Sequence, residues 1–125
     1  MKTKFYICPH CGNLIGMVKD KGVPVMCCGQ KMQPLVPNTV EASGEKHIPV
    51  ASIENGVLTV NVGSVDHPMA AEHFIEWVYV ETENGGIRRN LNPGEAPNVK
   101  IALGDEKAVA VYAYCNIHGL WMTEV

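Results

Sequence analysis

The cysteines and histidines of this chain fall into two groups whose spacing suits metal binding. All five cysteines and all but one of the five histidines belong to one group or the other, and only His10 is left over. The first group lies near the start of the chain and consists of Cys8, Cys11, Cys27 and Cys28. The second is spread over the rest and consists of His47, His67, His73, Cys115 and His118. Thiolates and imidazoles are ligands of zinc, iron and copper, so the sequence predicts two metal sites.

The first group predicts one metal held by four thiolates. Cys8 and Cys11 have the spacing of a chelating knuckle, and Gly12 lets the backbone turn toward the sulfurs. Cys27 and Cys28 are adjacent, and neighbouring side chains of an extended chain point in opposite directions. One metal can bind both only if the backbone bends and the S–metal–S angle opens, so we expect a distorted tetrahedron. Iron and structural zinc both suit this set, and a disulfide between the two neighbours is a weaker alternative. We expect His10 to be a solvated surface residue.

The second group predicts a redox metal, because four imidazoles and a thiolate are more donors than a tetrahedral structural zinc uses. Cys115 and His118 follow a strongly apolar run. His67 and His73 flank a short connection in which we expect one helical turn. The ligands would then come from strand ends and loops, where β-sandwiches present functional groups.

The sequence of residues 1–36 predicts a small domain whose stability depends on a bound metal. They are rich in Cys, Gly and Pro, and we expect two short strands, 14–18 and 23–26, around a turn at 19–22. A segment of this size cannot bury enough apolar surface to be stable alone, so it needs a metal, a partner chain or both.

Residues 44–125 predict an all-β domain, joined to the first by a linker over 37–43. Strands are expected at 57–62, 74–81, 99–103 and 108–114, where apolar and polar residues alternate or β-branched and aromatic residues gather. Turn signals at 54–56, 84–86, 92–94 and 104–105 separate them. Short strands at such spacing predict an antiparallel sandwich.

Composition excludes several other classes of protein. An apolar fraction of 46% allows a real core, and a net charge of −3 provides no basic surface for nucleic acid or a membrane. No apolar run approaches the roughly 20 residues needed to span a bilayer. The basic start is followed by no apolar signal segment, and an odd number of cysteines favours ligands over disulfides. We therefore expect a cytoplasmic protein.

Several short motifs follow one another along the chain. They are Cys8-x-x-Cys11-Gly12-Asn13, Cys27-Cys28, Glu45-Lys46-His47-Ile48-Pro49-Val50, His67-Pro68-Met69, Glu72-His73 and Cys115-Asn116-Ile117-His118-Gly119. In type and order, over nearly the whole chain, they resemble the desulfoferrodoxin family of superoxide reductases. The resemblance implies a desulforedoxin-like iron domain over 1–36 and an immunoglobulin-like sandwich over 44–125. It also implies one iron on the four cysteines of the first group, and a second iron with four histidines in a plane and Cys115 axial.

The same resemblance implies an activity: one-electron reduction of superoxide to hydrogen peroxide, without production of oxygen, and re-reduction by a small electron carrier such as rubredoxin. The axial thiolate would favour electron donation. Because the whole chain is negative, attraction of the superoxide anion must be local, and Lys46 is the expected attractor. Glu45 is expected either to occupy the sixth metal position or to relay protons. The resemblance also implies a homodimer.

Three alternatives stay open on the sequence. Cys115, His118 and Met122 imitate the copper-binding loop of a cupredoxin-like electron carrier. The first group also fits a zinc-ribbon module that docks onto another protein without redox chemistry. A superoxide dismutase would both oxidise and reduce superoxide.

Overall fold

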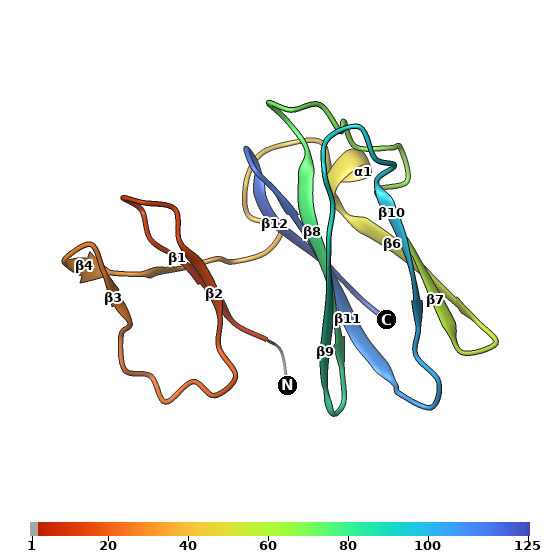
Figure 1. Ribbon diagram of the computed structural model, residues 1–125, viewed down its shortest axis with the longest axis horizontal. Helices are drawn as coiled ribbons and strands as arrows, with labels where there is room; N and C mark the ends of the chain where they lie inside the picture. The colour runs from red at the N-terminus through yellow and green to blue at the C-terminus, as the bar shows by residue number, and fades with distance from the viewer. Residues whose placement is uncertain (1–2) are drawn as a thin grey trace. The chain divides into compact units, whose positions relative to one another are not determined.

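The computed structural model describes residues 3–125, and the chain separates into two compact units, Met1–Val36 and Pro37–Val125 (Figure 1). Within the described residues, no helix has the length and apolar character needed to cross a membrane.

The smaller unit consists of short antiparallel strands around a very small core. Strand β1 (Phe5–Ile7) lies between β2 (Leu14–Gly16) and β5 (Gln33–Pro34), while β3 (Met26–Cys27) pairs with β4 (Gln30–Lys31). Of its described residues, the apolar side chains that are buried are Phe5, Cys8 and Met32. So little burial leaves the unit dependent on a metal or a partner, as the sequence predicts.

The predicted pairing of 14–18 with 23–26 is wrong. Strand β2 pairs instead with β1, and the ring of Phe5 packs so closely against Gly16 that an added Cβ would lie 3.1 Å from it. Val23 and Val25 are exposed and outside any strand. Pro24 between them has no N–H for a strand ladder, which is the physical reason that this stretch stays irregular.

The larger unit is an antiparallel sandwich. Across residues 37–125 it has one short helix and seven strands: α1 (Gly44–His47), β6 (Pro49–Glu54), β7 (Val57–Val62), β8 (Ile75–Thr82), β9 (Gly85–Asn90), β10 (Asn98–Ala102), β11 (Ala108–Cys115) and β12 (Gly119–Glu124). One sheet has the order β10-β7-β6 and the other β12-β11-β8-β9. This 3 + 4 arrangement is immunoglobulin-like, so the predicted all-β fold class is confirmed.

The core lies between these two sheets and follows the strand alternation. In β7 it takes Leu58, Val60 and Val62, and in β11 it takes Val111 and Ala113, all fully buried. The four strands predicted from sequence match β7, β8, β10 and β11 to within one residue. Strands β6, β9 and β12 were not predicted. They carry fewer inward-facing apolar residues, and two of them begin at glycine, which weakens the sequence signal.

Candidate metal centres

The four histidines and the cysteine of the second group meet at one end of the sandwich. Their positions are the last residue of α1, the connection between β7 and β8, the end of β11 and the turn into β12. Because β6, β7, β8, β11 and β12 run antiparallel, the start of β6, the end of β7, the start of β8, the end of β11 and the start of β12 fall at the same edge. The fold therefore brings together residues that lie far apart in sequence.

The four imidazole rings stand at the corners of a square. Neighbouring rings have centroids 4.6 Å (His47–His67), 4.7 Å (His67–His73), 5.1 Å (His73–His118) and 4.9 Å (His118–His47) apart, and each pair is nearly perpendicular. The diagonal pair His47–His73 is 6.3 Å apart. A square of edge-on rings surrounds a single point, which is how four nitrogens would bind one ion.

Hydrogen bonds fix which nitrogen faces that point in two of the four rings. Nδ1–H of His47 donates to the carbonyl of Ser43 at 2.6 Å, and Nδ1–H of His67 donates to the carbonyl of Pro68 at 2.7 Å. Both Nε2 atoms therefore carry lone pairs, and they lie 3.1 Å from each other. Burial lowers the pKa of His47, and it lowers that of His67 to about 4, so both rings are neutral at pH 7.

Nitrogen lone pairs that face one another at this distance repel, and a bound cation would remove the repulsion. Nε2 of His73 is also buried, without a hydrogen-bond partner among the described residues, and Nδ1 of His118 lies 3.1 Å from Nε2 of His47. Nitrogens about 2.1 Å from a metal are about 3.0 Å apart at right angles and about 3.4 Å apart in a tetrahedron. The observed spacing fits a square set of ligands better than a tetrahedral one.

Cys115 completes the set as a fully buried fifth donor. Its Sγ lies within 4.8 Å of the ligand nitrogens of His47, His67 and His73, and 3.9 Å from Nδ1 of His118. The backbone N–H of His118 points at the sulfur at 3.4 Å, which stabilises a thiolate there. A borderline-soft donor set of this size fits iron, and exceeds what tetrahedral zinc requires.

The two charged residues of the expected active site lie beside His47. Glu45 and Lys46 are both exposed, and within residues 3–125 the structure gives the ammonium group of Lys46 no ion pair. The carbonyl of Glu45 is held by the N–H of Val65 at 2.9 Å and the hydroxyl of Ser64 at 3.2 Å. The backbone of this segment is thus fixed, while the Lys46 charge remains available to a small anion.

Three further residues support the centre, and sequence reasoning assigned them no role. The amide of Asn116 accepts from the N–H of Phe74 at 3.0 Å and donates to the carbonyl of Glu72 at 3.1 Å, so it fastens the His73 segment to the turn after β11. The indole of Trp121 lies against His47. Gly63 packs against the backbone of the segment that carries Glu45 and Lys46. Asn116 could have been found from the sequence because it directly follows Cys115, whereas nothing in the sequence around Gly63 indicates its role.

The structure corrects one expectation about this region and argues against one of the alternatives. The connection between His67 and His73 has no helical turn, because Ala70 and His73 exchange backbone hydrogen bonds of 3.0 and 3.1 Å that close a tight bend. Met122 is opposite Tyr112 in the β11–β12 ladder, and Trp121 is opposite Ala113, which faces the core. Side chains alternate along a strand, so Met122 points away from the centre and cannot serve as a copper ligand.

The first group forms a second cluster, in the smaller unit. Its four sulfurs lie within 4.8 Å of one another, and all are free thiols. At about 2.3 Å from a metal, sulfurs of a regular tetrahedron are about 3.8 Å apart. The Sγ atoms of Cys11 and Cys27 are 3.6 Å apart and those of Cys27 and Cys28 are 4.0 Å apart. The wider spacing of the adjacent pair corresponds to an angle of about 120°, in line with the expected distortion.

Local backbone geometry makes this cluster possible. Cys28 adopts a positive φ of 53° and Gly29 one of 74°, and this bend turns neighbouring side chains to the same side. Gly12, at φ 84°, closes the other knuckle, where the N–H of Cys11 bonds to the sulfur of Cys8 at 3.4 Å. That bond, together with further hydrogen bonds from His10, Cys11 and Cys27, lowers the pKa of Cys8 to about 6. Hydrogen bonding among the crowded sulfurs raises the pKa of Cys27, and that of Cys28 to about 12. Ionisation of Cys27 and Cys28 at neutral pH therefore requires a nearby cation. His10 is exposed, as expected.

Comparisons with known proteins agree with these two clusters. The desulfoferrodoxin family model matches residues 39–124. The desulfoferrodoxin of Syntrophotalea carbinolica is 39% identical over 98% of this chain and 97% of its own length, and that of Nitratidesulfovibrio vulgaris is 36% identical over 97% and 95%. The crystal structure of the superoxide reductase from Treponema pallidum is 35% identical, covers 99% of this chain and 100% of its own, and has a TM-score of 0.83. The superoxide reductase from Nanoarchaeum equitans is 30% identical and covers 67% of this chain, with a TM-score of 0.52.

Proposed function

This chain belongs to the desulfoferrodoxin family, and from that premise we propose that it is a superoxide reductase of the two-iron type, an oxidoreductase that converts superoxide to hydrogen peroxide with one electron and two protons and releases no oxygen. The observation that carries the proposal is the square of four imidazoles with one buried thiol, next to a lysine that has no ion pair within residues 3–125. The proposed ligands are Cys8, Cys11, Cys27 and Cys28 for one iron, and His47, His67, His73, Cys115 and His118 for the other.

Iron held by His47, His67, His73, His118 and Cys115 would supply the electron, and these five donors would leave one coordination position open for a further ligand. The residues around it prepare that chemistry. The carbonyls of Ser43 and Pro68 hold two imidazoles in the tautomer whose Nε2 can bind the metal. The N–H of His118 offsets part of the negative charge on the Cys115 sulfur, which tunes how readily the centre gives up an electron.

Lys46 is proposed to attract the superoxide anion. The chain carries a formal charge of −3, so its overall field disfavours an anion, and attraction depends on cations close to the centre. Lys46 precedes the ligand His47 and is exposed. Glu45, also exposed, is proposed either to occupy the open position in the resting protein or to pass protons to the product, with water as the competing proton source.

Product stoichiometry tests the proposed reaction. The anaerobically reduced protein is pulsed with superoxide, and peroxide and oxygen are counted. One peroxide per superoxide without oxygen supports a reductase. Half a peroxide per superoxide with oxygen evolved would instead establish a dismutase, and no acceleration over the spontaneous reaction would leave an electron carrier.

A small electron carrier such as rubredoxin is proposed to restore the reduced state after each turnover. Cys11 and Cys28 of the first cluster are exposed, so an iron held there would lie near the surface of the smaller unit. Stopped-flow mixing of the oxidised protein with reduced rubredoxin tests the partner. Rapid re-reduction is expected, and a rate no faster than that of an unrelated carrier would contradict it.

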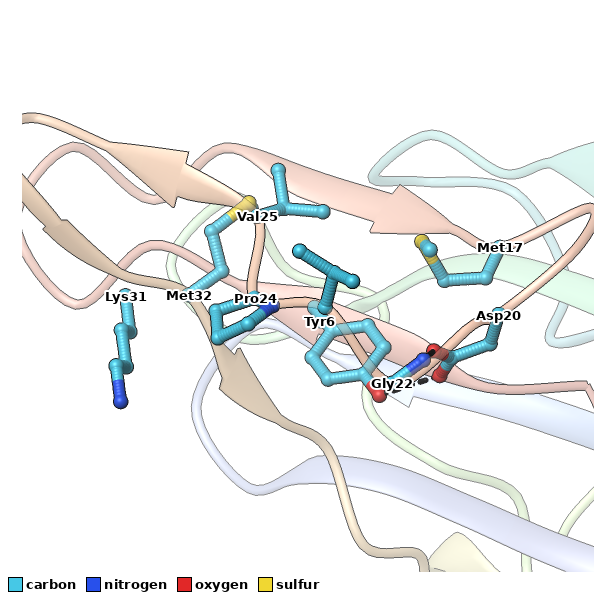
Figure 2. A pocket seen from close by; sticks show the side chains of 9 residues that line it. Tyr6, Met17, Asp20, Gly22, Pro24, Val25, Lys31 and Met32 are labelled. Carbon is cyan, nitrogen blue, oxygen red and sulfur yellow. Dashed lines mark hydrogen bonds between the residues drawn. The ribbon is translucent and has the colours of Figure 1, made fainter.

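We also propose a homodimer formed through the smaller unit. Val18, Val23 and Met26 are exposed by 103%, 72% and 59%, a large apolar surface for a unit with so little core. Figure 2 shows a pocket in the same unit, where Met17, Pro24, Val25 and Met32 surround the Tyr6 ring, whose hydroxyl donates to Asp20 at 2.7 Å. None of the four cysteines lines this pocket. Sedimentation equilibrium is expected to give twice the chain mass, and Val18→Asp together with Val23→Asp is expected to give monomers.

The remaining proposals concern location and domain limits. Five free cysteines acting as ligands fit the reducing cytoplasm. The domains are proposed to be 1–36 and 44–125, with the linker 37–43 anchored by Asn38, whose amide exchanges hydrogen bonds of 3.0 and 2.9 Å with the backbone of Met122. Expression of 37–125 alone tests the division, and this fragment is expected to fold and bind iron.

A further inference from the structure

One buried tryptophan contacts two of the five donors of the second centre. Trp121, in β12, is 4% exposed. Its ring lies against that of His47, with centroids 4.9 Å apart and planes tilted by 33°. Its Nε1–H donates to the carbonyl of His118 at 3.1 Å. These two ligands are 71 residues apart in the chain and belong to different elements.

We propose that Trp121 is a positioning residue for the metal, which holds the imidazole of His47 and the turn that carries Cys115 and His118 in their binding arrangement. The His47 ring is held at one edge by the Ser43 carbonyl, and the indole covers one of its faces. With both contacts in place, rotation of the ring about its side-chain bonds is blocked. The indole N–H fixes the carbonyl of His118, and so the backbone of the turn from which the His118 imidazole projects.

The proposal rests on the metal proposed for this centre, but not on the reaction. An iron-loaded protein without reductase activity would refute the proposed function and still allow the role of Trp121 to be measured. Partners of metal ligands typically change metal affinity by about 10–100-fold when removed. We therefore expect Trp121→Ala to weaken iron binding at the second centre by about tenfold or more. Trp121→Phe retains a ring beside His47 but loses the bond to His118, and its affinity is expected to lie between those of the wild type and Trp121→Ala.

The chain offers a matched control in Trp77. This indole is also buried, at 8% exposure, and stacks on Tyr114 with centroids 5.5 Å apart. Its partner in the ladder is Tyr114, whose side chain points to the opposite face of the sheet from Cys115 and Ala113. Trp77→Ala thus removes a comparable volume without touching a ligand, and it is expected to lower stability while leaving iron affinity unchanged.

Iron affinity is measured on the full chain, by equilibration with ferrous iron and graded concentrations of a chelator. Mössbauer spectra then count the nitrogen-rich centre separately from the four-sulfur centre. A tenfold loss of iron affinity at the second centre in Trp121→Ala, with little change of that affinity in Trp77→Ala, supports the positioning role. Equal losses in both variants, or no loss in Trp121→Ala, would overturn it. Should Trp121→Ala fail to fold, the comparison between Trp121→Phe and Trp77→Phe decides in the same way.

Fluorescence gives a second readout that a general loss of stability would not change. In Trp77→Phe the remaining indole is Trp121, and metal binding to the second centre is expected to quench it strongly because it lies against a ligand. In Trp121→Phe the remaining indole is Trp77, and weaker quenching is expected. Equal quenching in the two variants would contradict the contact on which the proposal depends.

Discussion

Replacement of Gly63 by alanine is expected to disturb the second centre without any change to a ligand. A Cβ at this position would lie 2.5 Å from the carbonyl oxygen of Glu45, 2.9 Å from that of Ile48 and 3.0 Å from the carbonyl carbon of Lys46. All three atoms belong to the backbone that carries His47, so no side chain can move aside. Relief of the closest contact to an ordinary separation of about 3.4 Å requires a shift of about 1 Å in this segment.

Such a shift has consequences for both stability and metal binding. Overpacking of a well-packed site costs about 1–3 kcal/mol. Moving Glu45 also weakens the bond that its carbonyl accepts from Val65. A displacement of about 1 Å exceeds the tolerance of about 0.5 Å within which a functional site must be held. We therefore expect Gly63→Ala to lose about 2 kcal/mol of unfolding free energy and to bind iron more weakly at the second centre, with the first centre unaffected.

Urea unfolding and iron analysis measure the two effects, and Gly85→Ala is the matched control. Gly85 begins strand β9, and a Cβ there would meet no heavy atom within 4 Å. The control is expected to change stability by no more than about 0.5 kcal/mol and to retain its iron. If Gly63→Ala behaves like this control in both assays, Gly63 does not position the Glu45–His47 segment.

Four further outcomes are expected. Lys46→Ala should slow superoxide capture by about tenfold at low salt and flatten its salt dependence with iron content intact; an unchanged bimolecular rate would remove Lys46 from the mechanism. Asn116→Ala should lose about 1 kcal/mol for each of its two amide hydrogen bonds and release iron from the second centre at lower chelator concentration, as iron analysis would show. Burial lowers the pKa of His67 in the folded, metal-free chain from 6.5 to about 4, so as the pH falls the unfolded chain binds the extra proton first. The stability is therefore fully present above about pH 6.5 and falls as the pH drops toward 4. Urea midpoints across that range would detect this fall, and His67→Gln should make the stability less dependent on pH. Chelation should unfold the smaller unit while the sandwich persists, and hydrogen exchange confined to residues 3–36 would verify this.

The sequence predicted which cysteines and histidines lie close together better than it predicted the backbone that brings them together. Cys28 illustrates the limit: adjacency to Cys27 implied a bend, but only the structure shows that a positive φ supplies it. Strand β7 alternates so regularly that its bounds were predicted without error, whereas β12 begins at Gly119 within a metal-binding motif and was missed. Trp121 and Gly63 act through contacts with distant segments, and a local pattern does not encode such contacts.

The two clusters differ in how their ligands are distributed, and this sets an order of assembly. Every sulfur of the first cluster comes from a unit of 36 residues with almost no core, so metal capture and folding of that unit are one event. The second centre draws on segments as far apart as residues 47 and 118, which meet only when both sheets have formed. A newly made chain short of iron would therefore carry a folded sandwich with an unfolded N-terminal segment. That segment would be the first target for proteases, so cellular iron supply would set how long the chain survives.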